Sequence, residues 1–368
     1  MSIRIACSEK TIADDAVNEL KNIFGATSIK MIVYFASSDF APQEISATMQ
    51  QVFAGATVFG CTTAGEIISG RMLKGAVVAM AFGEETISEV RVEVLENLSK
   101  MMAVNEAFCS FGKYFGESMD SMDPSQFFGI VLVDGLSGAE EQLMDTIGDK
   151  TNITFIGGSA ADDLKFSSSH VYANGKAYSD AAVLAVLKPG TSFELIKTQS
   201  VSPLDARLVV TKANAGQREI VEFNRKPASI AYAEALGVTV SDLANCFPRH
   251  PLGLLIEGEP YVRSPREIVG NSVFFNCSSV DGMELTLLEA SDLIGDTKAA
   301  LDGVLEKLGS ISGVVVFNCL YRAIELEKKN LADEYAKLFS DYPTIGFNCY
   351  GEQFIGHINQ TATMIVFR

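Results

Sequence analysis

The sequence predicts an α/β protein of two domains, with mixed sheets flanked by helices and built from duplicated β-α-β-β-β units. Three observations predict this class. A strand, a helix and a strand that ends in a Gly-rich loop follow one another over 30–66, and the same order returns 97 residues later, where Gly157 stands in the place of Gly60. A similar order occupies 313–352. The strands after these loops lie too close together in sequence for crossover helices, so we expect antiparallel hairpins and mixed sheets.

The first copy begins with an apolar run of strand length, KMIVYFA (30–36). The segment 42–53 has apolar residues at helical spacing. ATVFGCTTAGEI (56–67) is a strand that continues into a Gly-rich loop. Two further strands follow over 75–82 and 88–96, and the second of these alternates between apolar and polar residues.

The second copy repeats this order, and a helix over 105–119 joins the two copies. Its predicted elements are a strand over 128–135, a helix over 139–149, a strand and loop over 153–164, and closing strands over 180–187 and 193–200. A duplicated unit buries faces that a single copy would leave exposed.

Polar residues and a proline in SVSPLDA (200–206) mark the expected domain boundary. The first domain is therefore 1–200, with an internal repeat over about 28–97 and 126–200, and the second is 205–368. In the second domain we expect a hairpin over 208–224, helices over 227–237, 296–309 and 324–339, and strands over 272–277, 283–290, 313–319 and 344–367, the last interrupted by a loop.

Composition limits the class of function. The chain has 368 residues, 48% of them apolar, and a formal net charge of −17. Such an acidic surface repels nucleic-acid phosphates and anionic lipid. No stretch approaches the roughly 20 apolar residues of a membrane helix, and no signal peptide opens the sequence. We expect a cytoplasmic protein with no nucleic-acid partner and no membrane insertion.

Catalytic and metal motifs are weak. The sequence has no phosphate-binding loop and no complete nucleophile elbow, so we expect no enzyme. Cys277, Cys319 and Cys349 each end a Phe-Asn-Cys tripeptide at a predicted strand end. With His357 they would suffice for zinc or an iron–sulfur cluster, but their spacing gives no support, and such a cysteine is more often a small buried apolar residue.

The Gly-rich loops carry the candidate ligand contacts, because glycine allows close backbone approach and the residues between are small and polar. The candidates are Cys61, Thr62, Thr63 and Glu66 in GCTTAGE, Ser159 and Asp162 in GGSAADD, and Asn348, Tyr350 and Glu352 in GFNCYGE. The alternative is that the loops are structural corners in which Glu66 and Glu352 cap backbone amides.

Cys319 and Arg322 extend the candidate site, because they lie at the end of a neighbouring predicted strand. Arg322 and Glu352 at adjacent strand ends would clamp a carboxylate and an amine of one ligand, or would pair with each other. Both interpretations stay open. The cofactor is unassigned: His170, His250 and His357 are each a candidate axial haem ligand, although each is more often a plain polar residue.

Several separated motifs now combine. They are ATVFGCTTAGEI, GGSAADDL and DAAVLAVL in the first half, and FNRKPASIAYAEALG, HPLGL, YVRSP, VVVFNCLYR and GFNCYGEQFIGHINQTATMIVF in the second. In this order, over nearly the whole chain, they resemble the FIST-domain family, with a FIST N and a FIST C domain. The resemblance implies a sensory module of bacterial signal transduction that binds a small ligand such as an amino acid.

The resemblance also implies partners. FIST proteins accompany histidine kinases, chemoreceptors and cyclic-di-GMP enzymes, and some stand-alone members bind haem and sense nitric oxide. This sequence has no kinase or cyclase-like segment, so we expect a stand-alone sensor that acts through a separate histidine kinase or cyclic-di-GMP enzyme. The alternatives are a haem-binding nitric-oxide sensor, a thiol-dependent enzyme that uses Cys349, and a scaffold without a ligand.

Overall fold

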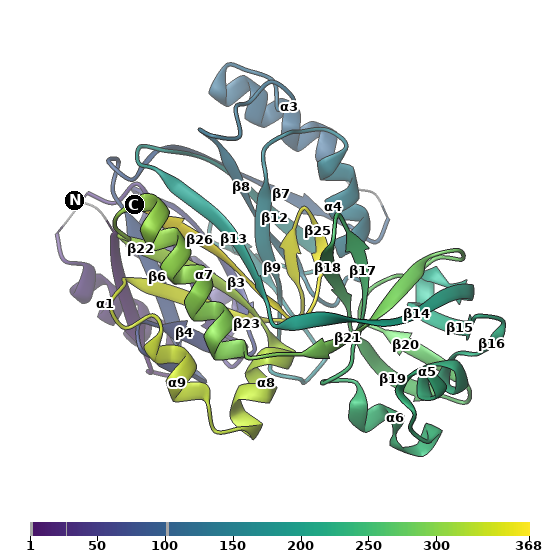
Figure 1. Cartoon of the computed structure of the whole chain (residues 1–368). Coiled ribbons are helices and arrows are strands. Elements are labelled where there is room, and N and C mark those ends of the chain that lie inside the picture. The colour runs from purple at the N-terminus through teal and green to yellow at the C-terminus, as the bar shows by residue number, and fades with distance from the viewer. Residues whose placement is uncertain (1–2, 27, 101–102) are drawn as a thin grey trace. The chain divides into compact units, whose positions relative to one another are not determined.

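The computed structural model describes residues 3–26, 28–100 and 103–368. They form two compact units (Figure 1). Unit 1 comprises Met1–Thr198, Lys298–His357 and Ala362–Arg368, and unit 2 comprises Gln199–Thr297 and Ile358–Thr361. The sequence division instead assigned all of 205–368 to one domain. Its first domain, 1–200, includes residues 1–2, 27 and 101–102, which lie outside the described residues.

Unit 1 contains three six-stranded sheets of one plan. In spatial order, the first sheet is β1 (Ile3–Ser8), β6 (Val77–Phe82), β2 (Met31–Ser37), β3 (Thr57–Thr63), β10 (Val171–Ala173) and β11 (Lys176–Tyr178). The second is β7 (Ile87–Glu96), β12 (Ala181–Pro189), β8 (Phe128–Asp134), β9 (Phe155–Ala160), β24 (Glu352–Phe354) and β25 (Gly356–Ile358). The third is β13 (Phe193–Gln199), β26 (Thr361–Phe367), β22 (Gly313–Cys319), β23 (Thr344–Cys349), β4 (Glu66–Ile68) and β5 (Arg71–Leu73).

The hairpin that follows each Gly-rich loop joins a sheet other than the one it leaves. The β4–β5 hairpin follows β3 but pairs with β23, the β10–β11 hairpin follows β9 but pairs with β3, and the β24–β25 hairpin follows β23 but pairs with β9. The three sheets are therefore interlocked in a cycle. The expected mixed pairing is confirmed, since β2 is parallel to β3 and antiparallel to β6.

The outer strands are exchanged in the same sense. The strand β7 follows β6 along the chain but pairs with β12, and β13 follows β12 but lies beside β26. The N-terminal β1 takes the equivalent place beside β6. The two repeats expected in the first half thus become three equivalent modules, of which the third is built by β13 together with the segment after unit 2.

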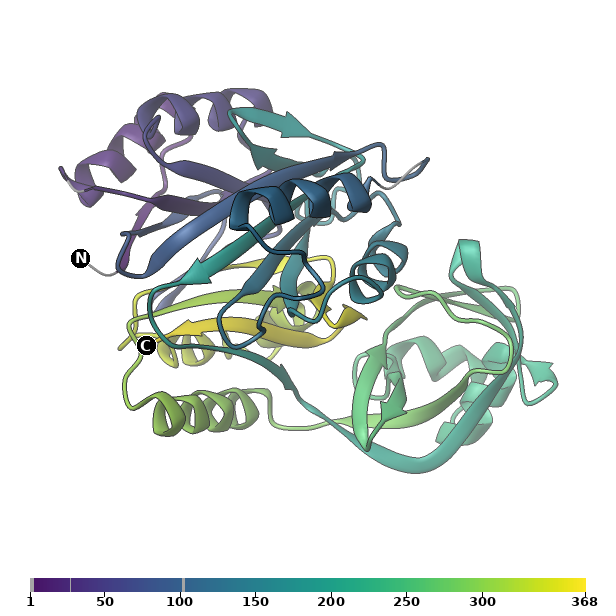
Figure 2. The ribbon, with the colours of Figure 1, turned by 90° about the horizontal axis from the view of Figure 1, so that it is seen from above.

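Helices cover the sheets of unit 1 on their outer faces (Figure 2). These helices are α1 (Ala13–Phe24), α2 (Pro42–Val52), α3 (Val104–Phe115), α4 (Glu140–Gly148), α7 (Leu293–Leu308), α8 (Leu320–Lys328) and α9 (Ala332–Lys337). The central strands β2, β8 and β22 are buried along their whole length. Between the sheets lies one apolar core, in which the ring of Phe35 contacts those of Phe317 and Phe347.

One glycine in each module is required by the close approach of two parallel strands. A Cβ atom on Gly60 would lie 1.9 Å from the Tyr34 carbonyl oxygen, and one on Gly157 would lie 1.7 Å from that of Val131. At Gly346 the corresponding distance, to the Val316 carbonyl oxygen, is 2.4 Å. These three glycines hold equivalent positions, each on the strand that leads into a Gly-rich loop and each against a carbonyl oxygen of the parallel neighbouring strand.

One local prediction is corrected. The helix expected over 324–339 is divided into α8 and α9, because Asn330 adopts a left-handed backbone conformation (φ 57°) that a helix cannot continue through. The strand β10, which follows His170, is buried against β3. His357 lies on β25, one strand before the last.

Unit 2 is an eight-stranded sheet with two helices. In spatial order its strands are β18 (Glu259–Arg263), β17 (Leu252–Ile256), β21 (Glu284–Ala290), β14 (Val201–Asn214), β15 (Glu219–Phe223), β20 (Ser272–Phe275) and β19 (Pro265–Val269), with β16 (Lys226–Pro227) paired to β15. The helices α5 (Ala228–Leu236) and α6 (Val240–Cys246) cover an apolar core. The two outermost strands, β18 and β19, are joined by Ser264 alone, so the ends of the sheet meet at this residue.

Candidate functional site

The three Gly-rich loops of unit 1 are hydrogen-bonded to one another through their backbones. The donor and acceptor pairs are Asn348 N to Gly65 O (2.8 Å), Ala64 N to Asn348 O (3.0 Å), Ser159 N to Gly351 O (2.8 Å), Tyr350 N to Ser159 O (3.2 Å) and Ala161 N to Thr62 O (3.1 Å). The exchange of hairpins brings the loops to this junction, because each loop connects two sheets. The loops therefore hold the three sheets together at this junction.

The predicted ligand residues are mostly buried at this junction. Tyr350 is half-buried, and the buried residues are Cys61, Thr62, Thr63, Glu66, Ser159, Asp162, Cys319, Arg322, Asn348 and Glu352. Cys61 belongs to the apolar core, and its burial raises the pKa of the thiol well above its usual value. Cys61 therefore packs as an apolar residue rather than facing the polar groups of the loops.

Arg322 lies in a polar network that the sequence did not predict. Its Nε donates to Asn318 Oδ1 at 3.2 Å, and its guanidinium lies 5.8 Å from the centre of the Tyr335 ring. The Tyr335 hydroxyl also donates to Asn318 Oδ1, at 3.2 Å. Asn318 Nδ2 in turn donates to Asn348 Oδ1 at 2.9 Å. Arg322 and Glu352 are 2% and 0% exposed, and each has further interactions within the chain.

Two buried glutamates occupy equivalent places in the first and third loops. Glu66 accepts from Thr63 Oγ1 and from the Ala76 amide (3.0 Å), and Glu352 accepts from the Cys349 thiol at 3.2 Å. In both loops the donor side chain lies three residues before the glutamate. Burial raises the pKa of Glu66 from 4.5 to about 7, although the hydrogen bonds from Thr63 and Ala76 oppose the shift. Glu66 caps a backbone amide, as the structural alternative predicted.

In the second loop, Asp162 organises the segment that follows it. Burial raises the pKa of Asp162, but hydrogen bonds from the Tyr350 hydroxyl and from the backbone amides of residues 166–168 outweigh it, so the pKa is lowered. The Tyr350 ring stacks on Phe166 with centroids 5.1 Å apart. Asp162 and Tyr350 thus tie the second loop to the third.

Gln353 is the functional candidate that sequence reasoning missed. Its Nε2 donates to Ser159 Oγ at 3.0 Å and lies 3.1 Å from His357 Nδ1, while its Oε1 is buried without a hydrogen-bond partner. Rotating the amide by half a turn would only exchange the two ends, so one end of Gln353 lacks a partner in either orientation. Its place directly after the Gly-Glu pair that recurs in the first and third loops was the only sequence signal for it.

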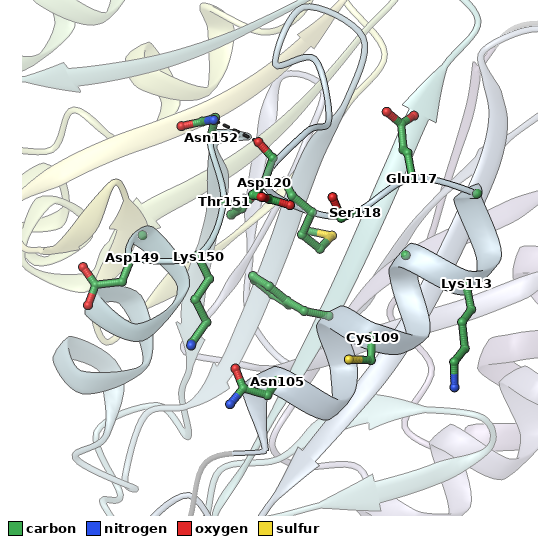
Figure 3. A pocket seen from close by; sticks show the side chains of 15 residues that line it. Asn105, Cys109, Lys113, Glu117, Ser118, Asp120, Asp149, Lys150, Thr151 and Asn152 are labelled. Atoms are coloured by element: carbon green, nitrogen blue, oxygen red, sulfur yellow. Dashed lines mark hydrogen bonds between the residues drawn. The ribbon is translucent and has the colours of Figure 1, made fainter.

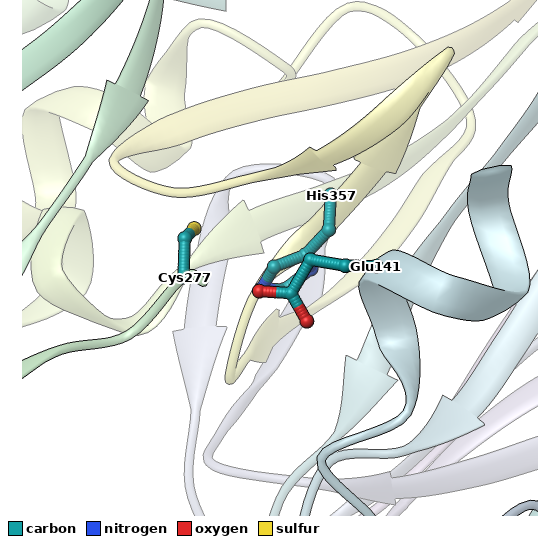
Figure 4. Close-up of side chains that lie close together, drawn as sticks. All are labelled: Glu141, Cys277 and His357. Carbon is teal, nitrogen blue, oxygen red and sulfur yellow. The ribbon is translucent and has the colours of Figure 1, made fainter. Parts of the chain in front are cut away.

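His357 lies near both Gln353 and the carboxylate of Glu141. Figure 4 shows His357 on the β25 hairpin and Glu141 on α4, with their possible ligand atoms within 4.8 Å of each other. Cys277, also drawn there, belongs to unit 2. The other two thiols of the discounted metal set, Cys319 and Cys349, are side-by-side residues of β22 and β23, and burial raises the pKa of Cys349 well above its usual value.

The remaining histidines lie elsewhere. His170 is half-buried beside the first loop, where its amide donates to Thr62 Oγ1 at 2.9 Å, and burial lowers its pKa. His250 is in unit 2, and its Nδ1 is buried without a hydrogen-bond partner. The three candidate haem ligands therefore lie in three different surroundings.

A groove of about 950 Å³ opens on unit 1 away from the predicted residues (Figure 3). It lies between α3 and the end of α4, with Phe108 and Met119 among its apolar residues and Lys113 and Lys150 among its charged ones. Asn152 Nδ2 donates to the Asp120 carbonyl oxygen at one side of it (3.1 Å). Nothing in the motifs of the sequence indicated this groove.

Over the described residues, no helix combines the length and the apolar character needed to cross a membrane.

Comparisons with known proteins give the family. The sequence model of the FIST N domain matches residues 30–226, and that of the FIST C domain matches residues 228–355. The chain is 25% identical over 319 residues to Uncharacterized protein MJ1623 of Methanocaldococcus jannaschii, an alignment that covers 81% of this chain and 61% of that protein. The resemblance seen in the motifs is confirmed, and the chain belongs to the FIST-domain family.

Proposed function

We propose that this chain is a sensory module that binds a small polar ligand in unit 1 and passes the signal to a separate protein. FIST domains are associated with sensing in signal transduction. The observation that carries the ligand proposal is the buried Gln353 carboxamide, which has an end without a partner beside Ser159 and His357. Buried polar groups are almost always hydrogen-bonded, so a group of this kind is a candidate ligand contact.

The proposed ligand is a small polar metabolite such as an amino acid. A hydroxyl, a carboxamide and an imidazole in one buried row provide both donors and acceptors. Glu352, Arg322 and Asn348 would hold the row in place rather than touch the ligand, because their own polar groups are engaged with neighbouring side chains. We further propose that the protein is cytoplasmic, has no catalytic activity of its own, and acts through a histidine kinase or a cyclic-di-GMP enzyme.

The experiment is calorimetry of the purified protein against amino acids and related metabolites, with native mass spectrometry for a retained ligand. Gln353→Met keeps the length of the side chain but removes the amide, so we expect binding to weaken by about tenfold or more. Gln51→Met, at an exposed position of α2, is the matched control and should bind as the wild type does. Equal binding by both variants would exclude Gln353 from the site, and a folded wild type that binds nothing in the panel counts against the sensor proposal.

A haem version of the proposal is favoured by one observation. Histidine is a common axial ligand of haem iron, and among the described residues the buried ring nitrogen without a hydrogen-bond partner belongs to His250. Reconstitution with haemin should then give a Soret band that moves on addition of nitric oxide and is lost in His250→Ala but kept in His170→Ala. A spectrum without a Soret band in the wild type ends this version.

A further inference from the structure

Unit 2 contains a cluster of buried polar side chains at the point where its sheet closes. Ser264 joins the two outermost strands, β18 and β19. The backbone amide of Asn276, at the end of β20, donates to the Ser264 carbonyl oxygen at 2.9 Å. The segment Ile358–Thr361 belongs to the same unit, and its Asn359 accepts a hydrogen bond from the Cys277 thiol at 2.8 Å. The closure thus gathers three separate pieces of chain.

Three side-chain atoms of this cluster are buried and have no hydrogen-bond partner. They are Ser264 Oγ, Ser279 Oγ and Asn359 Nδ2, and their residues are 0%, 2% and 1% exposed. The orientation of the Asn359 amide follows from the Cys277 thiol, which donates to its Oδ1 and so leaves the NH2 end unpartnered. A native protein seldom leaves even one such group unpaired, because each costs the free energy of its lost hydration.

A guanidinium contacts one of these segments. Arg263 directly precedes Ser264, and its Nη1 donates to the carbonyl oxygen of Ser278 at 3.0 Å, one residue before Ser279. A guanidinium has five N–H donors, so this single bond leaves most of its donor capacity for other groups. The segments that meet here therefore carry two hydroxyls, an amide NH2 and a guanidinium.

This set of groups determines the chemistry of a ligand. The amide NH2 and the guanidinium only donate, and the hydroxyls can donate as well, so the complementary group is rich in acceptors. One guanidinium balances one negative charge, whereas a dianion in a buried site would keep an uncompensated charge, which is costly. A carboxylate has four acceptor positions and a single charge, and it pairs with guanidinium in two parallel hydrogen bonds.

We propose that unit 2 binds the carboxylate of a small organic acid through Ser264, Ser279, Asn359 and Arg263. The site lies outside the residues of the sensor proposal, and its test does not depend on that role. Cys277 positions Asn359 and does not itself contact the carboxylate. In the ligand-free protein the three unpaired groups are a local cost, which binding of the carboxylate removes.

The test uses acetate and acetamide, which have nearly the same shape but differ in charge. Saturation-transfer NMR on the full-length, extensively dialysed protein should show acetate binding, with no comparable signal for acetamide or for inorganic phosphate. Ser279→Ala should weaken acetate binding by about tenfold to a hundredfold, since one hydrogen bond to a charged group is lost. Ser202→Ala, at an exposed serine of unit 2, is the matched control and should bind acetate as the wild type does.

Arg263→Gln tests the charge separately, and it should abolish the preference for acetate over acetamide. Ser279→Ala removes a hydroxyl without a partner, so its melting temperature without acetate should equal or exceed that of the wild type, while the rise caused by acetate should be lost. The proposal is overturned if acetate gives no signal with the wild type, if Ser279→Ala binds it equally well, or if acetamide or phosphate binds as strongly. A melting temperature of Ser279→Ala that falls without acetate would show that the hydroxyl has a structural partner, and would also overturn it.

Discussion

Asn318 and Asn348 lie side by side on the parallel strands β22 and β23, and Asn318 Nδ2 donates to Asn348 Oδ1 at 2.9 Å. The same register places Phe317 beside Phe347 and Cys319 beside Cys349. The repeated Phe-Asn-Cys tripeptide of the two strands is therefore a ladder of identical pairs. The phenylalanine pair lies in the apolar core, and the asparagine pair lies in the polar network. The cysteine pair lies at the strand ends, where the chain leaves the sheet.

Asn318→Ala should destabilise the protein strongly. Asn318 Oδ1 accepts from both Arg322 and Tyr335, so the substitution leaves a buried guanidinium and a buried hydroxyl each short of a partner. We expect the free energy of unfolding to fall by about 2–4 kcal/mol. Urea denaturation measures this, with Asn18→Ala at an exposed position of α1 as the control. A loss no larger than in the control would contradict the role assigned to the network.

Glu66 should make the stability depend on pH. Its pKa is 4.5 when unfolded and about 7 when folded, because burial disfavours the charged form. Below pH 4.5 the carboxyl is neutral in both states and carries no penalty. Between pH 4.5 and 7 the folded state keeps a proton that the unfolded state releases, so the free energy of unfolding falls as the pH rises, by about 3 kcal/mol in total.

Glu66→Gln should remove this dependence, because a carboxamide does not titrate and still accepts from the Ala76 amide. Chemical denaturation at several pH values, wild type minus variant, isolates the contribution of Glu66 from that of other groups. Parallel stability curves of the two proteins between pH 4.5 and 7 would show that the pKa of Glu66 is not raised.

Gly157→Ala should prevent stable folding. The new methyl group would lie 1.7 Å from the Val131 carbonyl oxygen, and a backbone atom in the middle of a sheet cannot move away. We expect a loss of about 3 kcal/mol or more. Gly55→Ala is the matched control, since an added Cβ there meets no atom within 4 Å. The comparison is one of melting temperatures, and similar values for both variants would refute the close approach of β8 and β9.

Thiol labelling should distinguish the cysteines by burial. Cys109 is exposed, whereas Cys61 and Cys349 are buried and burial raises the pKa of both thiols. The thiolate is the reactive form, so a thiol reagent should modify Cys109 first and Cys61 and Cys349 only after unfolding. Mass spectrometry of the native protein, with Cys109→Ser as the control, measures the order. Rapid labelling of Cys349 in the folded protein would instead support the alternative that the protein is a thiol-dependent enzyme.

The sequence alone determined the elements whose local pattern is strong. Apolar runs such as 30–36, 128–135 and 313–319 became buried central strands, because only a strand covered on both faces tolerates continuous apolar residues. Glycines at the strand ends indicated the loops, and separated motifs indicated the family. The helix predicted over 324–339 failed at Asn330, where a single backbone conformation outweighs the apolar spacing.

Only the tertiary structure decided which segments meet. The exchange of hairpins between sheets depends on contacts between residues far apart in the chain, as when Glu352 pairs with Gly158, and local periodicity carries no information about such partners. For the same reason the sequence could name Ser159 but not Gln353 beside it, and could not tell that Arg322 is enclosed by Asn318 and Tyr335. Whether a polar side chain is satisfied by the protein or left for a ligand is a property of its neighbours in space.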